Sequence, residues 1–427
     1  MAETAITDAG PAETEAETAT SVARCIVCRA ARVEPFLDLG ATALANKFLR
    51  TEDLARPEPC LPLVAGFCHG CGHVQLTETV PPEAMFEDYL YISSASDTLR
   101  EHLYELSDAI VARFPLDAGD LVIDVGCNDG TLLKGFRRYG VRTLGVDPAK
   151  NLAALSGDSE IDRVVDFFSA ASARRIVDRW GPATIITATN TFPHIPDLRD
   201  FMNGIRTALA PGGAFVIEAH YLLDMIEQCA FDTIYHEHVS YWALGPMTRL
   251  FAAHGLHVTH VERLPIHHGQ LRVFVQRQGE GAVDASVEET LEAERLLGIG
   301  EIETYRLFAE QARRIKADLC RTLTDLRGQG KRVVGYGAPA KGNTLLNFLE
   351  IGPDTIDYIA DRSPLKQGLV TPGSHIPVVP PERLLAEQPE YVLLLAWNFA
   401  EEIMRQLASY SERGGHFILP VPEVRIV

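Results

Sequence analysis

A short segment near the middle of the chain concentrates side chains that can carry protons. Residues 235–238 read Tyr-His-Glu-His. Imidazole changes its charge near neutral pH, and a neighbouring carboxylate or phenol can orient it or polarise a substrate. This predicts general acid/base chemistry on Tyr235, His236, Glu237 and His238. Two alternatives stay open: a second metal site through the two histidines, or histidines that only fill the core. The spacing is not H-E-x-x-H, so zinc-protease geometry is excluded.

Four cysteines form two C-x-x-C pairs in the N-terminal part of the chain. Cys25 and Cys28 make the first pair, and Cys68 and Cys71 make the second, after 39 intervening residues. A C-x-x-C turn directs two thiolates to one side, and four sulfur ligands complete a tetrahedral zinc site. Redox chemistry is the competing interpretation, but two such pairs favour a metal. Because four cysteines leave no ligand position open, the sequence predicts a structural zinc.

A glycine motif stands where a buried strand turns into a helix. Residues 121–130 read LVIDVGCNDG, and the helix-like TLLKGFRRYG follows. This pattern opens a nucleotide-binding α/β unit, because glycine lets a cofactor approach the main chain and the helix N-terminus offers unpaired N–H groups. The next apolar run ends at Asp147, where a carboxylate can accept both ribose hydroxyls of an adenosine. The predicted cofactor residues here are Asp124, Gly126, Asn128, Gly130 and Asp147.

Three features favour S-adenosylmethionine over NAD as that cofactor. The motif is D-V-G-C-N-D-G rather than G-x-G-x-x-G, and its acidic loop suits an amino group better than a pyrophosphate. NTFPHIPD follows the third apolar run, where methyltransferases often place substrate-side residues; within it Asn190 is assigned to the cofactor and His194 to the catalytic group. LAPGGAFVIE is the turn and strand typical of class I methyltransferases. Asp166, Phe167 and Phe168 lie where that fold contacts adenine, although core packing explains the two phenylalanines equally well.

The composition excludes some classes of partner. The 427 residues carry a formal net charge of -19, which argues against nucleic acid recognised through its phosphates. No apolar run reaches the roughly 20 residues that span a membrane. The N-terminal tail has no basic residue before Arg24 and no hydrophobic segment, unlike a signal peptide, so a reducing cytoplasmic location is expected.

The elements that must position these residues fall into four expected segments. These are an acidic disordered tail (1–22), a zinc-binding subdomain (23–80), a cofactor-binding methyltransferase domain (81–280) and a second α/β domain with its linking helix (281–427). In the third segment, four apolar runs alternate with helical stretches, which predicts a parallel sheet covered on both faces. The runs are 121–125, 143–146, 185–188 and 214–218. Ligands of such a sheet lie at the carboxyl ends of its strands.

A long helix is predicted over residues 286–327, between the two α/β units. Its apolar positions recur every three or four residues and mark one buried face. The residues of that face are Phe308, Ala312, Ile315, Leu319, Leu323 and Leu326.

A second glycine turn opens the C-terminal unit. KRVVGYGAPAKGNTLLNF predicts a short strand at Val333 and Val334, a turn at 335–337 and a helix from Thr344. The loop DRSPLKQGLVTPGSHIPV comes next. Basic side chains near a glycine turn in an acidic chain predict a site for an anionic ligand, and a solvated loop is the alternative. The residues assigned to this site are Tyr336, Gly337, Lys341, Asn343, Arg362, Lys366 and His375.

Together these motifs resemble those of the bacterial nucleotide-sugar C-methyltransferases of antibiotic deoxysugar biosynthesis. The resemblance covers residues 22–427 and rests on the paired C-x-x-C, IDVGCNDG, NTFPHIPD, TIYHEHVSYW, GYGAPAKGNTLLNF and DRSPLKQGLVTPGSHIPV. It implies an α/β fold in three parts: a small N-terminal zinc-binding subdomain, a central class I S-adenosylmethionine-dependent Rossmann-like domain, and a C-terminal Rossmann-like domain. The last would help to bind the thymidine diphosphate (TDP) of a 4-keto-deoxysugar.

The resemblance also implies roles for individual residues. Tyr89, His194, Tyr235, Glu237 and His238 would surround the sugar. His238 would remove the C-3′ proton, with His236 as the alternative base. Loss of this proton next to a ketone gives an enolate, whose carbon is nucleophilic enough to accept a methyl group. Glu237 and Tyr235 would orient or polarise, and His194 or Tyr89 would hold the enolate oxygen.

One motif of the chain departs from the family pattern, and other reactions are alternatives to methylation at C-3′. Where the family has H-G-G-S before L-R, residues 267–270 read H-H-G-Q, which leaves the exact sugar undecided. Methylation at C-5′, or at oxygen or nitrogen of a related sugar, is an alternative to methylation at C-3′. An NAD-dependent sugar-modifying enzyme is another, although GYGAPA lacks the full dinucleotide motif. The expected protein is a monomer or weak dimer.

Overall fold

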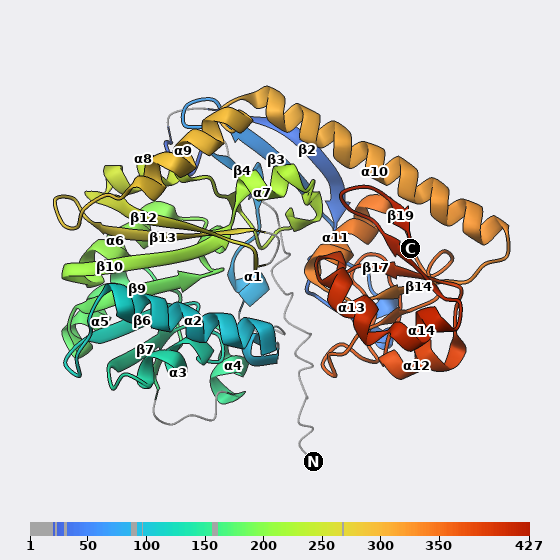
Figure 1. Cartoon of the computed structure of the whole chain (residues 1–427), viewed down its shortest axis with the longest axis horizontal. Helices are drawn as coiled ribbons and strands as arrows, with labels where there is room; N and C mark the ends of the chain where they lie inside the picture. The colour runs from blue at the N-terminus through green and yellow to red at the C-terminus, as the bar shows by residue number, and fades with distance from the viewer. Residues whose placement is uncertain are drawn as a thin grey trace, which may run out of the picture.

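The computed structural model describes residues 20–21, 24–29, 32–86, 92–95, 97–155, 161–266 and 269–427. Two α/β bodies lie side by side in Figure 1, and the long helix α10 (Ile302–Gly328) runs along the top from the centre of the view over the right-hand, C-terminal body. A smaller antiparallel sheet packs against this helix. None of the described helices is long and apolar enough to cross a membrane.

The first body is built on a seven-stranded sheet in the order β12-β13-β10-β9-β6-β7-β8. The strands are β6 (Leu121–Val125), β7 (Arg142–Val146), β8 (Asp162–Val164), β9 (Ala183–Thr189), β10 (Leu209–His220), β12 (Leu256–Leu264) and β13 (Gln270–Arg277). The five strands from β10 to β8 are parallel to one another. β13 is antiparallel to both of its neighbours. The predicted parallel sheet is confirmed for β6, β7, β9 and β10, with β13 and β12 added at one edge and β8 at the other.

The strands of this sheet are apolar on both faces because helices cover both faces. Val122 belongs to one core cluster, with residues of α2 (Asp97–Arg113) and α3 (Thr131–Arg137). Its neighbour Ile123 belongs to the opposite cluster, with residues of α5 (Ala170–Trp180) and α6 (Leu198–Ala208). The remaining helices of this body are α4 (Lys150–Leu155), α7 (Leu222–Glu227) and α8 (Leu244–Ala253).

The N-terminal region forms a four-stranded antiparallel sheet in the order β11-β4-β3-β2. Three strands come from the first 80 residues: β2 (Val33–Thr42), β3 (Leu61–Cys68) and β4 (Val74–Leu76). The fourth, β11 (Ser240–Tyr241), directly follows the histidine segment 235–238 and pairs with β4. The N-terminal sheet therefore anchors the C-terminal end of the segment predicted to carry the chemistry. A short pair, β1 (Thr20–Ser21) with β5 (Glu78–Thr79), and α1 (Glu83–Phe86) complete this region.

The second body contains a six-stranded sheet in the order β16-β15-β14-β17-β18-β19. Its strands are β14 (Val333–Tyr336), β15 (Ile359–Ala360), β16 (Val378–Val379), β17 (Tyr391–Leu394), β18 (His416–Leu419) and β19 (Arg425–Ile426). Only β19 is antiparallel. The predicted helix start at Thr344 is wrong, because α11 runs from Ala340 to Leu349 with Pro339 as its N-cap. Lys341 therefore lies in the first helical turn rather than in a loop. The other helices are α12 (Pro381–Glu387), α13 (Ala400–Gln406) and α14 (Ala408–Glu412).

The predicted long linking helix is two helices. α9 (Ala285–Leu297) ends because Gly298 adopts a left-handed backbone with φ of 76°, which terminates a helix readily, and α10 begins at Ile302. The predicted buried face of α10 is confirmed at all six positions, and Tyr305 extends it. The Tyr305 ring contacts Phe36 of β2 and Phe67 of β3, with ring centroids 5.1 and 5.0 Å away. α10 thus ties the N-terminal sheet to the C-terminal body.

Candidate active site and metal centre

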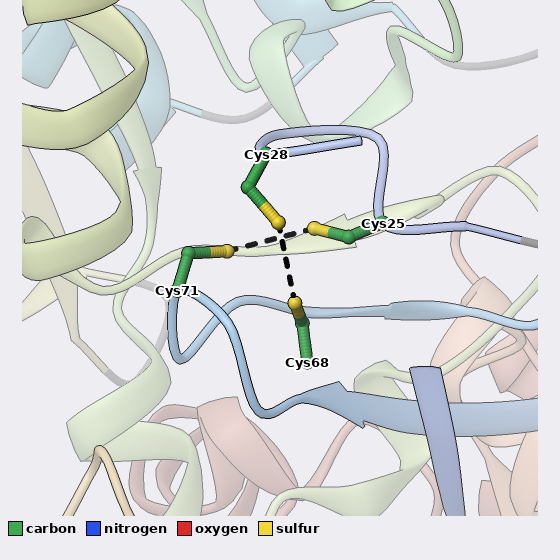
Figure 2. Close-up of side chains that lie close together, drawn as sticks. All are labelled: Cys25, Cys28, Cys68 and Cys71. Carbon is green, nitrogen blue, oxygen red and sulfur yellow. Dashed lines mark hydrogen bonds between the residues drawn. The ribbon is translucent and has the colours of Figure 1, made fainter. Parts of the chain in front are cut away.

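The four predicted zinc ligands converge on one point. The sulfur atoms of Cys25, Cys28, Cys68 and Cys71 all lie within 4.8 Å of one another. Figure 2 shows the side chains pointing inward from two separate loops, with Sγ–Sγ distances of 3.5 Å for Cys25–Cys71 and 3.6 Å for Cys28–Cys68. Sulfurs about 2.3 Å from a central zinc lie about 3.8 Å apart in a tetrahedron, so the cluster fits the ion. Four cysteines leave no open position, and the zinc is structural.

The glycine loop after β6 has the backbone shape that the motif predicted. Gly126 has φ of 75°, and a Cβ added to it would lie 2.0 Å from Oγ1 of Thr191, so only glycine fits there. Gly130 is the N-cap of α3, with φ of 81°. Asn128 adopts a left-handed conformation with φ of 51°. The loop therefore presents main chain rather than side chain to a bound cofactor.

Two carboxylates stand at the ends of β6 and β7. Asp124 is buried, its Oδ1 accepts a hydrogen bond of 2.7 Å from the Thr187 hydroxyl, and burial raises its pKa to about 7. Asp147 accepts hydrogen bonds of 2.9 Å from the backbone N–H groups of Asn128 and Ala149. These contacts fix the Asp147 carboxylate beside the glycine loop, where a ribose ligand is expected.

Replacing Asp147 with alanine is expected to weaken S-adenosylmethionine binding about tenfold to hundredfold. A hydrogen bond to a charged group contributes roughly 1.5–3 kcal/mol, and each 1.4 kcal/mol is a factor of ten in affinity. Isothermal titration calorimetry measures the change. Asp178→Ala, an exposed position on α5, is the matched control and should bind normally. Unchanged affinity in the Asp147 variant would remove this residue from the cofactor site.

One cavity of about 630 Å³ joins the two α/β bodies. It lies at the carboxyl ends of the parallel strands β6, β7, β9 and β10, as the sheet rule predicts. Of the predicted site residues it is lined by Asp124, Gly126, Asn128, Asp147, Asp166, Phe167, Phe168, Asn190, His194, Tyr235, His238, Lys341 and Lys366. The glycine loop of the predicted cofactor site and part of the histidine segment therefore line the same cavity.

His238 is held in one tautomer by the two contacts of its ring nitrogens. Its Nδ1 lies 2.9 Å from the Thr233 carbonyl oxygen, which only accepts, so Nδ1 carries the proton. Its Nε2 lies 2.8 Å from the Tyr235 hydroxyl, which donates to it. Burial, together with the neighbouring His194, lowers the pKa of His238 well below its ordinary value. The ring is therefore neutral at neutral pH, with a lone pair on Nε2.

Two further histidines, His194 and His220, lie beside the His238 ring. His194 lies 5.1 Å from His238 between ring centroids, and burial lowers the pKa of His194 to about 4. His220 lies 5.2 Å from His238 and also lines the cavity. His220 is not among the site residues predicted from the sequence, although its position as the last residue of β10 was a usable signal. Tyr89, predicted to lie near these groups, is outside the described residues.

Glu237 and His236 point towards the N-terminal region instead. Glu237 accepts a hydrogen bond of 2.7 Å from the side chain of Asn46. His236 lies 3.2 Å from the Pro62 carbonyl oxygen. Neither Glu237 nor His236 lines the cavity. Asn46 does line it, and no sequence signal pointed to this residue. The histidine segment is thus split, with Tyr235 and His238 towards the cavity.

The predicted anion site is only partly assembled. Lys341 and Lys366 line the cavity, and Lys366 donates a 2.7 Å hydrogen bond to the Ala338 carbonyl. Asn343 instead donates to the Ala45 carbonyl at 2.7 Å, and His375 pairs with Glu58 at 2.7 Å, so both hold the N-terminal region against the second body. Five of the seven residues of the predicted anion site lie outside the cavity lining: Tyr336, Gly337, Asn343, Arg362 and His375. Gly130 of the predicted cofactor site also lies outside it.

Comparison with known families divides the chain as the fold does. Residues 25–86 match a model described as "Putative zinc binding domain", residues 99–261 match "Methyltransferase domain", and residues 265–422 match "C-methyltransferase C-terminal domain".

Three similar proteins illustrate the range of relatives. The C-methyltransferase NovU of Streptomyces niveus is 38% identical over 404 residues, which cover 94% of this chain and 96% of NovU. The ubiquinone biosynthesis O-methyltransferase of Acinetobacter baylyi is 28% identical over 99 residues, 22% of this chain and 42% of that protein. The crystal structure of an S-adenosylmethionine-dependent methyltransferase from Anabaena variabilis aligns with 46% of this chain and 98% of its own, at 15% identity and a TM-score of 0.33.

The match to NovU extends through the zinc region, the seven-stranded body and the C-terminal body. The fold and the loop after β6 agree with use of S-adenosylmethionine, and the cysteine cluster agrees with bound zinc. The chain is a methyltransferase and belongs to the family of C-methyltransferases that includes NovU.

Proposed function

We propose that this enzyme transfers a methyl group to C-3′ of a TDP-linked 4-keto-deoxysugar through an enolate that a side-chain base generates. One observation carries the proposal. The predicted cofactor residues, the His238–Tyr235 pair and two lysines of the C-terminal body line the same cavity. A methyl donor and an anionic sugar can therefore meet inside one cavity, beside a neutral imidazole.

The state of His238 supports carbon as the methyl acceptor. A ketone acidifies the C–H bond beside it, but a base must still remove that proton before the carbon becomes nucleophilic. The hydrogen bond from His238 to Thr233 leaves Nε2 as the basic atom, and Tyr235 donates to this atom. In the proposed step Nε2 takes the C-3′ proton, and the electron pair of that C–H bond forms the C-3′–C-4′ double bond of an enolate. The π pair of the C-4′ carbonyl moves onto its oxygen, which becomes an oxyanion. S-adenosylmethionine supplies the methyl group.

The charge of the C-terminal part of the cavity supports an anionic nucleotide portion. Lys366 lines this part, together with Pro339 and Ala340 at the N-terminus of α11. A helix N-terminus and lysine side chains both favour phosphate oxygens. In a chain with a net charge of -19, this local concentration of positive charge points to a phosphorylated ligand.

A panel of TDP-linked 4-keto-deoxysugars tests the proposal directly. Each sugar is incubated with the enzyme and S-adenosylmethionine, and mass spectrometry and NMR identify the product. We expect a mass increase of one methylene unit and a new C–CH₃ signal at C-3′. Without the methyl donor, the C-3′ proton should exchange with deuterium from solvent. A product methylated at oxygen or nitrogen, with no exchange at carbon, would refute carbon methylation.

A further inference from the structure

The ammonium group of Lys341 lies buried in the cavity region without a hydrogen-bond partner. Lys341 occupies the first turn of α11 and lines the cavity. Its Nζ is shielded from solvent and donates to none of the described groups. Lys366, the other lysine of the cavity, already donates to the Ala338 carbonyl. Asp232 attracts this charge but accepts no hydrogen bond from it. A buried ammonium without an acceptor is costly, so the Lys341 ammonium is placed to meet a group that the protein itself does not provide.

The surroundings of Lys341 connect it to His238 rather than to the surface. Lys341 Nζ lies 5.9 Å from the centre of the Trp397 ring. The Trp397 indole N–H donates a 2.6 Å hydrogen bond to Asp232, a fully buried carboxylate on the 3-10 helix η4 (Phe231–Thr233). The next residue, Thr233, accepts the hydrogen bond of His238. One packed cluster therefore holds the ammonium and the imidazole.

Electrostatics agrees with this arrangement. Burial lowers the pKa of Lys341, and the attraction of Asp232 acts in the opposite direction, in favour of the charged amine. The Lys341 charge in turn contributes to the lowered pKa of His238. Burial also keeps His194 neutral, with a pKa of about 4. Near His238, the available cation is thus the lysine rather than this histidine.

We infer that Lys341 is a catalytic residue, whose ammonium donates a hydrogen bond to the ketone oxygen of the sugar and stabilises the oxyanion of the enolate. The inference rests on the proposed function. When Nε2 of His238 takes the proton from carbon, the electron pair of the broken C–H bond forms the carbon–carbon double bond. The carbonyl π pair then moves onto oxygen. This new negative charge, beside Lys341, also offsets the repulsion between the ammonium and the newly protonated imidazole.

The test separates a role at the ketone from a role at the diphosphate. Lys341→Met removes the charge and keeps the length of the side chain, and Lys366→Met is the matched variant from the same cavity. Loss of one oxyanion donor typically costs about 10²–10³ in kcat. We expect Lys341→Met to lose that factor in both kcat and solvent deuterium exchange at C-3′. Its affinity for TDP, measured by calorimetry, should stay within about threefold of the wild-type value, whereas Lys366→Met should lose TDP affinity.

Chemical rescue guards against an effect of misfolding. Lys341→Ala opens space for a small amine, so added methylammonium should restore part of the lost exchange rate, and S-adenosylmethionine affinity verifies the fold. Wild-type exchange rates in Lys341→Met, or a loss of TDP affinity with kcat retained, would overturn the assignment while the proposed function stands. Absence of exchange by the wild-type enzyme with every sugar of the panel would instead overturn the proposed function, and the Lys341 role with it.

Discussion

His238→Asn is expected to lower kcat about 10³-fold, within the range of 10²–10⁴ that a positioned base contributes. Asparagine can still donate to the Thr233 carbonyl, which His238 contacts at 2.9 Å, but it offers no basic nitrogen to the cavity. The Tyr235 hydroxyl also loses the acceptor that it has at 2.8 Å. Binding of S-adenosylmethionine should change little. Single-turnover assays with calorimetry of cofactor binding separate the two effects.

His236→Asn is the matched control for this experiment. It makes the same chemical change two residues away, at a ring that contacts the Pro62 carbonyl and does not line the cavity. We expect near-normal turnover from the control. Normal turnover in the His238 variant, or a collapse of turnover in the His236 variant alone, would reject His238 as the base. Solvent deuterium exchange at carbon gives the same comparison without methyl transfer.

Cys28→Ser is expected to abolish stoichiometric zinc binding and to lower the thermal unfolding midpoint by about 10 °C. Binding of a structural zinc contributes directly to folding free energy, and loss of several kcal/mol shifts the midpoint of a large domain by this order. Cys28 is half-buried, so its replacement disturbs packing less than that of the fully buried Cys68. Metal analysis and calorimetry measure the two effects.

The same variant should also lose activity, because the zinc-binding region reaches the cavity. Asn46 lines the cavity and binds Glu237, and β4 pairs with β11 next to the histidine segment. Cys60→Ser is the matched control, since Cys60 is exposed and outside the cluster, and it should retain zinc, stability and turnover. Full zinc content and an unchanged midpoint in Cys28→Ser would contradict a four-cysteine site.

The elements that the sequence predicted well depend on local patterns. Gly126 fits a turn that admits no Cβ, and the strand before it shows the apolar run of a buried parallel strand. The buried face of α10 follows from a period of three to four residues. The boundaries were less secure, because they depend on single residues. Gly298 ends a helix inside an otherwise helical pattern, and α11 starts at Ala340, directly after Pro339 and four residues before the predicted start at Thr344.

The sequence by itself determined the cofactor and the zinc ligands, because each depends on short motifs whose residues lie within a few positions of one another, the glycine loop and the two C-x-x-C pairs. It also predicted a segment for acid/base chemistry at residues 235–238. The tertiary structure decided which members of that segment face the cavity. His238 and Tyr235 do so, whereas His236 and Glu237 bind the N-terminal region. It also divided the seven residues of the predicted anion site, of which Lys341 and Lys366 reach the cavity. Such choices depend on packing between segments about 100 to 300 residues apart, and no local pattern of side chains encodes that packing.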